Sequence, residues 1–465
     1  LAVLRVGEHL AGALLVHVRV VEQAEAHLRL QHPLDGGVER RLVDAATLDA
    51  AVQRVLEAKV RLGLLDDPYV DEERAREVLA DPQHREIARV AAERAAVLLK
   101  NDDDLLPLDP SALESLAVIG PLGASKRDTL GPWVFDFDLD ETVTVLDGIR
   151  AHVGEALRVE YAQGVPVTQR TFPSMFDMFG GNRPEDPAGF DPESAFDEAV
   201  RVARDADVAV VVVGEWQNMI GEAASRSSLD LPGRQLELLQ AVVATGTPTV
   251  VLVMNGRPLD LRWAAEQVPA ILDIWYPGSQ GGAAVANLLF GDAAPGGRLP
   301  FSWPRTVGQV PMIYAHTRSH EPENQERRYW DEASTPLFPF GHGLGYGRFR
   351  YDGLTVDRAS VPLDGTVTVS LEVTNTGDRD GDEVVQLYLH QRSGTASRPV
   401  RELKGFRRVP VPAGSSARVA FEVGPDARRY WNAAARDWVV DASRFDVWVG
   451  GDSTAGLTAT FDVTA

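Results

Sequence analysis

The sequence contains no cysteine, so it can form no disulfide bond and offers no thiol for nucleophilic or redox chemistry. It has no apolar run approaching the ~20 residues that a membrane-spanning helix requires, and no signal peptide is visible. Internal repeats and low-complexity tracts are also missing. The chain starts at Leu1 and not at Met, so we expect it to be a piece of a longer protein.

Basic residues are in the minority: 46 Lys and Arg stand against 68 Asp and Glu, which gives a formal net charge of -22. An acidic surface repels nucleic acid and anionic membranes and favours neutral or cationic partners, although acidity also serves solubility alone. The chain has 465 residues, of which 44% are hydrophobic. This length suffices for roughly two to four globular domains, each with its own core.

The N-terminal 37 residues show loose helical periodicity without clear caps or turns. They contain four of the ten histidines of the chain, at spacings that match no zinc-binding pattern. These histidines are His9, His17, His27 and His32. We expect residues 1–37 to be either a broken end of a larger domain or a segment outside its native reading frame.

Three regions of different character follow. Residues 44–64 predict an amphipathic helix, 70–82 a charged and loop-like linker, and 84–99 a second helix. Between about 100 and 345, strand and helix patterns alternate, which is typical of parallel βαβ units. The strands are expected at 116–121, 159–164, 208–213, 249–256 and 270–278, and the helices at 142–153, 194–206, 235–244 and 281–290. From about 354 to 463, short alternating segments separated by turns predict a β-sandwich.

The most informative stretch runs from 208 to 232. Residues 208–213, VAVVVV, predict a strand that is buried on both faces, and the polar loop after it carries Glu215, Glu222 and Arg226. In open α/β sheets, ligands bind at the carboxyl ends of the strands. We therefore expect the functional site on this loop.

Several motifs in this order resemble the β-glucosidase and β-xylosidase group of family-three glycoside hydrolases, over residues of about 38 to 460. The resemblance rests on AVQRVLEAKVRLGLLDDPY, AAERAAVLLKNDDDLLPL, LAVIGP, VVVVGEWQNMIGEAASRSSLDLPGRQ, VVLVMNGRPLDL, IWYPGSQGGAAVANLLFGDAAPGGRLPFSWPR, PLFPFGHGLGYGRFRY, VTNTGDRDGDEVVQLYL and RPVRELKGF. Each motif is modest evidence alone, but their order and spacing are specific.

The resemblance implies an α/β plus all-β architecture. Residues 100–345 would form an (α/β)6 sandwich domain and 346–465 a fibronectin-III-like domain. Residues 1–69 would be the truncated end of a (β/α)8 barrel, and 70–99 a linker and helix. The family's nucleophile is an Asp in a barrel motif of the kind SDW, which this chain lacks. We therefore expect the chain alone to be inactive.

Retaining glycoside hydrolysis requires two carboxyl groups, one as the nucleophile and one as the acid/base. The resemblance implies that the acid/base comes from the loop after residue 214, a few residues beyond the Gly-Glu at the strand end. Glu222 matches this position best, and Glu215 is the second choice. The alternative is that both carboxylates only cap the backbone or form salt bridges.

Substrate-binding candidates flank these carboxylates. Arg226 would pair with Glu222 or with Glu215, or remain solvated. Trp133 corresponds loosely to a tryptophan near the sugar site of relatives, with core packing as the alternative. Trp216, together with the segment 172–179, would wall an aglycone subsite or simply pack. We interpret Asp273, Trp275 and Tyr276, which close a neighbouring strand, as structural.

We expect no cofactor and no metal. His316 and His320 are four residues apart, but the prolines and aromatics around them argue against a helix, and the segment 118–131 lacks the spacing of a phosphate loop. The expected partners are a β-linked oligosaccharide or an aryl or alkyl β-glycoside and the missing barrel domain, with neither nucleic acid nor membrane. A non-catalytic carbohydrate-binding or interaction module is the competing hypothesis.

The β-sandwich is expected to be scaffolding. A sugar-binding platform needs several aromatic residues on one face, and Trp431 and Trp438 lie singly where later strands begin. The sandwich should contact the α/β domain through GHGLGY and RFRY, residues 341–346 and 348–351.

Overall fold

The computed structural model describes residues 44–66, 68–69, 71–79, 81–134, 138–169, 185–317 and 329–465. The chain divides into two compact units, Leu1–Asp81 and Pro82–Ala465, and each is described here by itself. The expectations for residues 1–37, for the segment 172–179 and for His320 lie outside the described residues.

The first unit contains two described helices, α3 (Ala45–Arg61) and α4 (Glu72–Leu79). The side chain of Asp44 caps α3 by accepting a hydrogen bond from the Thr47 amide (2.7 Å), as expected for an N-cap residue. The expectation of a loop-like linker at 70–82 is wrong, because α4 occupies most of it. Its acidic first turn complements the helix dipole, and charged pairs three residues apart stabilise it.

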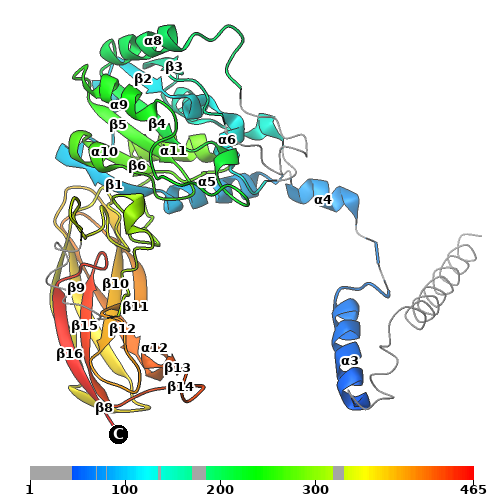
Figure 1. Cartoon of the computed structure of the whole chain (residues 1–465), viewed down its shortest axis with the longest axis vertical. Coiled ribbons are helices and arrows are strands. Elements are labelled where there is room, and N and C mark those ends of the chain that lie inside the picture. The colour runs from blue at the N-terminus through cyan, green and yellow to red at the C-terminus, as the bar shows by residue number, and fades with distance from the viewer. Residues whose placement is uncertain are drawn as a thin grey trace, which may run out of the picture. The chain divides into compact units, whose positions relative to one another are not determined.

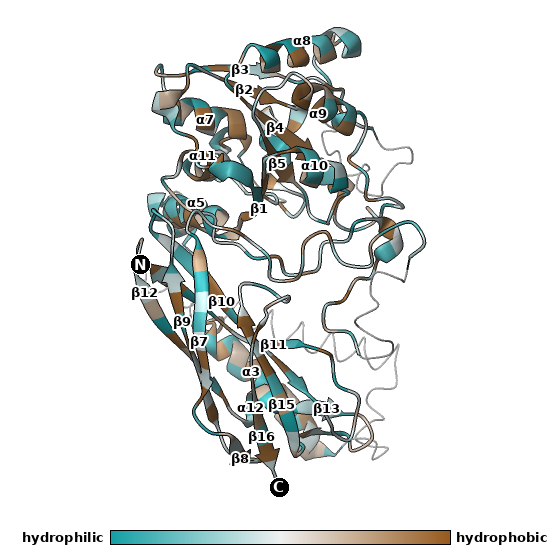
Figure 2. Cartoon of the chain, turned by 90° about the vertical axis from the view of Figure 1, so that its left-hand side faces the viewer, coloured by the Kyte–Doolittle hydropathy of each residue, from teal (hydrophilic) through white to brown (hydrophobic). Residues whose placement is uncertain are grey.

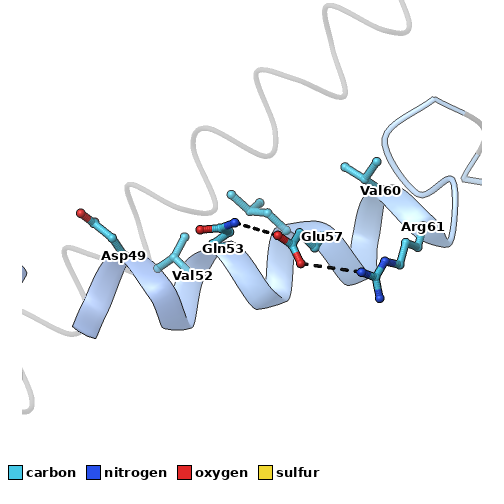
Figure 3. A pocket seen from close by; sticks show the side chains of 7 residues that line it. Asp49, Val52, Gln53, Glu57, Val60 and Arg61 are labelled. Atoms are coloured by element: carbon cyan, nitrogen blue, oxygen red, sulfur yellow. Dashed lines mark hydrogen bonds and ion pairs between the residues drawn. The ribbon is translucent and has the colours of Figure 1, made fainter. Parts of the chain in front are cut away.

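One side of α3 carries an apolar stripe that stays exposed. Figure 3 shows side chains along this helix, including Val52 and Val60, and the groove of about 600 Å³ beside them is lined, among the described residues, by α3 alone. The apolar side chains of the stripe are between 47% and 56% exposed. They are Leu48, Val52, Val55, Leu56 and Val60. Such a stripe is typical of a helix face that packs against another element.

The second unit begins with a six-stranded sheet in the order β1-β6-β5-β4-β2-β3 (Figure 1). Strands β2 to β6 run parallel to one another, and the edge strand β1 is antiparallel to β6. The strands are β1 (Val97–Asn101), β2 (Ser115–Ile119), β3 (Arg158–Ala162), β4 (Val208–Gly214), β5 (Thr249–Met254) and β6 (Ala270–Asp273). The predicted (α/β)6 domain is confirmed.

Helices cover both faces of this sheet. On one face, α7 and α11 share a core with alternate residues of the strands, and α5 packs on α11, where Asn287 donates to Glu93 (2.7 Å). On the other face, α8, α9 and α10 share a second core. The helices are α5 (Pro82–Ala95), α7 (Val145–Val153), α8 (Pro192–Arg204), α9 (Gln235–Val243), α10 (Arg262–Gln267) and α11 (Gly281–Phe290). Figure 2 shows the central strands β4 and β5 as strongly hydrophobic, as burial on both faces requires.

One helix prediction was too long. The helix expected at 84–99 ends at Ala95, and the aliphatic residues after it form β1 at the edge of the sheet. A short apolar run fits a buried helix end as well as a strand. The segment becomes a strand because it pairs in antiparallel orientation with β6, with Val97 opposite Asp273.

Helices α7 and α11 approach so closely that a methyl group added at Gly148 would overlap the backbone of Gly282. We expect Gly148→Ala to lower the free energy of unfolding by about 1–3 kcal/mol, because overpacking forces the helices apart. Without this contact, the change would stabilise the helix by up to ~1 kcal/mol. Urea unfolding measures the effect, with Gly456→Ala, whose added methyl has no atom within 4 Å, as the control. A Gly148→Ala protein more stable than the wild type would contradict the prediction.

The C-terminal part is a two-sheet β-sandwich, as predicted. A five-stranded sheet, β11-β10-β15-β16-β8, packs on a three-stranded sheet, β12-β9-β7, and their inward residues form one core. The strands are β7 (Phe349–Val356), β8 (Ser360–Pro362), β9 (Val367–Asn375), β10 (Gly381–Gln391), β11 (Glu402–Val411), β12 (Ser416–Val423), β15 (Ser443–Gly450) and β16 (Leu457–Thr464).

The segment 341–346 joins the sandwich to the α/β domain. The Leu344 amide donates to the Leu98 carbonyl in β1 (2.8 Å), and the Gln386 side chain in β10 donates to the Gly341 carbonyl (2.9 Å). Arg348 pairs with Asp104 of the α/β domain. The predicted docking role of the 341–346 and 348–351 segments is therefore confirmed.

Candidate active-site loop after strand β4

The candidate site lies where the order of the strands reverses. Strands β2 and β4 are neighbours, but the chain leaves β2 toward β3 at one edge and leaves β4 toward β5 on the other side. Connections that diverge in this way open a crevice at the carboxyl ends of the strands, where α/β proteins bind ligands. The connection after β2 carries Trp133, and the one after β4 carries Glu215 and Glu222.

The end of β4 is fixed by its neighbours. A methyl group at Gly214 would overlap the carbonyl oxygen of Met254 in β5, so the close approach of these two strands requires glycine. Gln235, the first residue of α9, accepts from the Gly214 amide (2.7 Å) and donates to its carbonyl (2.9 Å). The Glu215 amide donates to the Met254 carbonyl (2.9 Å). The loop therefore leaves the sheet in one defined direction.

Glu215 is fully buried between two guanidinium groups. Its Oε1 lies 3.0 Å from Arg226 Nη1 and 3.2 Å from Arg257 Nε. Burial raises the pKa of the Glu215 carboxyl, and the two positive charges oppose this shift. Arg226 thus pairs with Glu215, one of the partners considered above, and its Nη2 also donates to the Asp230 carbonyl (2.7 Å). For Glu215, these contacts agree with the alternative that the carboxylate forms salt bridges and does not act as the acid/base.

Sequence analysis missed Arg257, which holds the loop in place. Its Nη2 donates to the carbonyls of Met219 and Ala224, each at 2.8 Å, and these residues lie on either side of Glu222. Arg257 follows β5, the neighbour of β4, within the NGRP motif. The signal that could have found it is a charged residue just beyond the carboxyl end of the adjacent strand.

Glu222 occupies the exposed tip of this loop. It lies between Gly221, with φ of 97°, and Ala223, with φ of 56°, so the backbone is left-handed on both sides of it. A non-glycine residue in this region is strained and persists only where its surroundings hold it, which is typical of functional sites. Within the described part of the chain, the Glu222 carboxylate makes no hydrogen bond and no ion pair, so it is accessible to a group from outside.

The connection after β2 also contacts the β4 loop, near the start of that loop. Asp128, on the short helix α6 (Lys126–Leu130), is buried, which raises the pKa of its carboxyl, and it accepts hydrogen bonds from the Gln217 amide (2.8 Å) and the Ser125 hydroxyl (2.6 Å). Trp133 is 63% exposed, and Cζ2 of its indole would be 3.3 Å from a methyl group at Gly221. The structure thus brings an exposed indole next to the residue that precedes Glu222.

Known protein families match both domains of the second unit. Residues 96–346 match the Glycosyl hydrolase family 3 C-terminal domain, and residues 383–453 match the Fibronectin type III-like domain. The chain belongs to glycosyl hydrolase family 3. The first match includes the entire six-stranded sheet and the β4 loop.

The family 3 relatives are longer than this chain. A periplasmic β-glucosidase of Salmonella typhimurium is 39% identical over 442 residues, which are 92% of this chain and 57% of the relative. A β-xylosidase of Formosa agariphila is 39% identical over 90% of this chain and 55% of its own length. The crystal structure of a Listeria innocua β-glucosidase in complex with glucose superposes with a TM-score of 0.79, at 31% identity over 93% of this chain and 56% of that one. This family 3 chain therefore spans little more than half the length of these relatives.

Trp216 and the residues at the end of β6 lie in the core of the family 3 domain or pack against it. Trp216 is buried in the core on one face of the sheet, which favours the packing interpretation over an aglycone wall. Asp273 is also buried, which raises the pKa of its carboxyl well above the usual range, and it accepts a hydrogen bond from the Trp275 amide (3.1 Å). The Tyr276 hydroxyl donates to the Glu215 carbonyl (3.1 Å). These contacts support the structural interpretation of the β6 end.

No group of three or more metal-ligating side chains occurs among the residues that the structure describes. His316 contacts the carbonyl of Thr317 through Nδ1 (3.1 Å). Within the same described ranges, no helix is long and apolar enough to cross a membrane.

Proposed function

We propose that this family 3 chain carries the acid/base of a retaining β-glycosidase that removes terminal β-D-glucosyl or β-D-xylosyl residues. The proposal rests mainly on the placement of Glu222, which is exposed at the tip of a loop that Glu215 and Arg257 hold at the crevice between β2 and β4. The two sugar classes follow the names of the Salmonella and Formosa relatives.

In the proposed mechanism, the Glu222 carboxyl donates a proton to the glycosidic oxygen while an aspartate outside this chain attacks the anomeric carbon. The resulting glycosyl-enzyme is hydrolysed when the Glu222 carboxylate takes a proton from water. Such a pair requires carboxyl groups about 5–5.5 Å apart. The exposed position of Glu222 suits this role, because a second domain placed over the loop tip can exclude water from it.

Glu215 is less suited to this role. To reach a substrate it would have to leave two guanidinium groups and the protein interior, whereas Glu222 already faces outward. We assign Glu215 the task of positioning the loop, together with Arg257. Arg226 contributes through Glu215, and Trp133 offers an indole face on which a sugar ring can stack beside the acid.

The nucleophile is proposed to come from a barrel domain that would cover the apolar stripe of α3. We expect the purified chain to show no turnover of p-nitrophenyl β-D-glucoside or β-D-xyloside, because an acid without a nucleophile leaves the covalent step unassisted. Extending the chain N-terminally by the part of the Salmonella β-glucosidase that it does not match should produce activity. The control is Glu222→Gln in the same fusion, assayed on cellobiose, whose leaving group needs a proton.

Turnover by the unextended chain would contradict this assignment of the nucleophile. A folded fusion that binds β-glycosides and hydrolyses none would instead favour the hypothesis of a carbohydrate-binding module.

A further inference from the structure

A short hairpin in the sandwich domain presents two tryptophans on one face. Strands β13 (Tyr430–Asn432) and β14 (Asp437–Val439) pair so that Trp431 lies opposite Trp438. Residues directly opposite in an antiparallel pair project to the same side. The two rings are 6.0 Å apart at 73°, and the residues remain 53% and 55% exposed. We call residues 430–439 the tryptophan hairpin; in Figure 1 it follows directly after α12 (Pro425–Arg428).

The opposite side of the tryptophan hairpin is anchored in the sandwich. The Tyr430 hydroxyl donates to Asp441 (2.5 Å), and the guanidinium of Arg398 lies 4.2 Å from the Tyr430 ring centre. The Asn432 side chain donates to the Thr395 hydroxyl (2.8 Å). These contacts hold the hairpin in one orientation, so its outward face is a preorganised surface.

Stability of the hairpin alone does not require two exposed tryptophans. An aromatic pair across two strands contributes to stability, but smaller aromatic or β-branched residues do the same with less exposed apolar area. Two indoles that are more than half exposed on one anchored face form an apolar patch of the kind that serves as an interaction site. Trp431 and Trp438 lie apart in the sequence, which led us to expect that the β-sandwich serves as scaffolding alone. The strand register brings the two residues onto one face, and the proposal below replaces that expectation.

Polar groups continue from the indoles along α12. The guanidinium carbon of Arg429 lies 5.2 Å from the Trp438 ring centre, and Arg429 Nη1 is 3.3 Å from Asp426 Oδ1. Asp426 also lines an open groove of about 570 Å³, which we call the α12 groove. The hydrogen-bonding side chains of this groove are Thr366, Lys404, Glu422 and Asp426.

We propose that the tryptophan hairpin and the α12 groove together bind a neutral oligosaccharide chain. A pyranose ring has apolar C–H faces that stack on indoles and a rim of hydroxyls that pairs with both acidic and basic side chains. An anionic polymer fits poorly, because the surface carries both signs of charge and the chain has a net charge of -22. A stable protein interface usually buries about 1,200–2,000 Å² around an apolar centre, whereas here two indoles are surrounded by charges.

The test uses the 465-residue chain, with cellohexaose and xylohexaose as probes in calorimetry and tryptophan fluorescence. Trp431→Ala and Trp438→Ala should each weaken binding of the preferred hexaose by about tenfold or more, which is the loss of one stacked ring. Trp330→Ala is the matched control, since Trp330 is fully exposed outside the hairpin. Because the hairpin variants could disturb folding, Asp426→Ala in the α12 groove is included, and it should also weaken binding while thermal unfolding stays unchanged.

Four results would overturn the proposal. The wild-type chain could bind neither hexaose, or the hairpin variants could bind as tightly as Trp330→Ala. Loss of all binding in Trp133→Ala would place the saccharide at the β4 loop. Conversion of a wild-type dimer to a monomer by Trp431→Ala, seen in sedimentation, would identify the surface as a contact between two copies of the chain.

Discussion

Replacing Glu222 by glutamine in the N-terminally extended protein is expected to lower kcat/KM for cellobiose by about 10²–10⁴-fold, the usual contribution of a general acid. The same change should leave kcat/KM for 2,4-dinitrophenyl β-D-glucoside within about tenfold of the wild type, because this leaving group departs without a proton. Steady-state kinetics on the two substrates measures the difference. An equal loss on both would contradict the assignment of Glu222 as the acid.

A second experiment tests the base role of the same carboxylate. In Glu222→Ala, azide should restore turnover of the dinitrophenyl substrate and yield the β-glycosyl azide, because azide attacks the glycosyl-enzyme without losing a proton. Glu266→Ala is the matched control, since Glu266 is an exposed glutamate on α10 and not on the β4 loop. Azide rescue of a Glu215 variant in place of the Glu222 variant would reverse the assignment of the two residues.

Replacing Glu215 by alanine is expected to destabilise the chain by about 3–5 kcal/mol, because it leaves Arg226 and Arg257 charged and largely buried without their shared partner. The loop should loosen at the same time, so trypsin should cleave after Arg226 faster than in the wild type. Urea unfolding and limited proteolysis measure the two effects.

The control for this prediction is Glu237→Ala. Glu237 forms an ion pair with Arg234 that is largely solvent-exposed, and such pairs contribute only about 0–1 kcal/mol. A double-mutant cycle between Glu215 and Arg257 then isolates their coupling. If Glu215→Ala were no more destabilising than Glu237→Ala, the loop would not depend on the buried cluster, and the positioning role of Glu215 would be wrong.

Local sequence patterns predicted most of the fold. The run of valines at β4 predicted a strand buried on both faces, and the glycines and charged residues after it marked the loop, because periodicity and turn chemistry are properties of neighbouring residues. The errors occurred where local preference is ambiguous. The aliphatic residues of β1 resembled a helix end, and α4 resembled a loop because its composition is strongly charged.

The candidate carboxylates, Glu215 and Glu222, were both visible in the sequence together with the family motifs, since these motifs are contiguous. Which of the two is proposed as the acid/base and which as the loop-positioning residue depends on the tertiary structure. Arg257 comes from a different strand connection, and only the parallel pairing of β4 with β5 brings it to Glu215 and to the carbonyls around Glu222. The pairing of Trp431 with Trp438 likewise arises from strand register. Burial, charge pairing and shared faces are set by neighbours in space, and a single sequence read in order does not contain them.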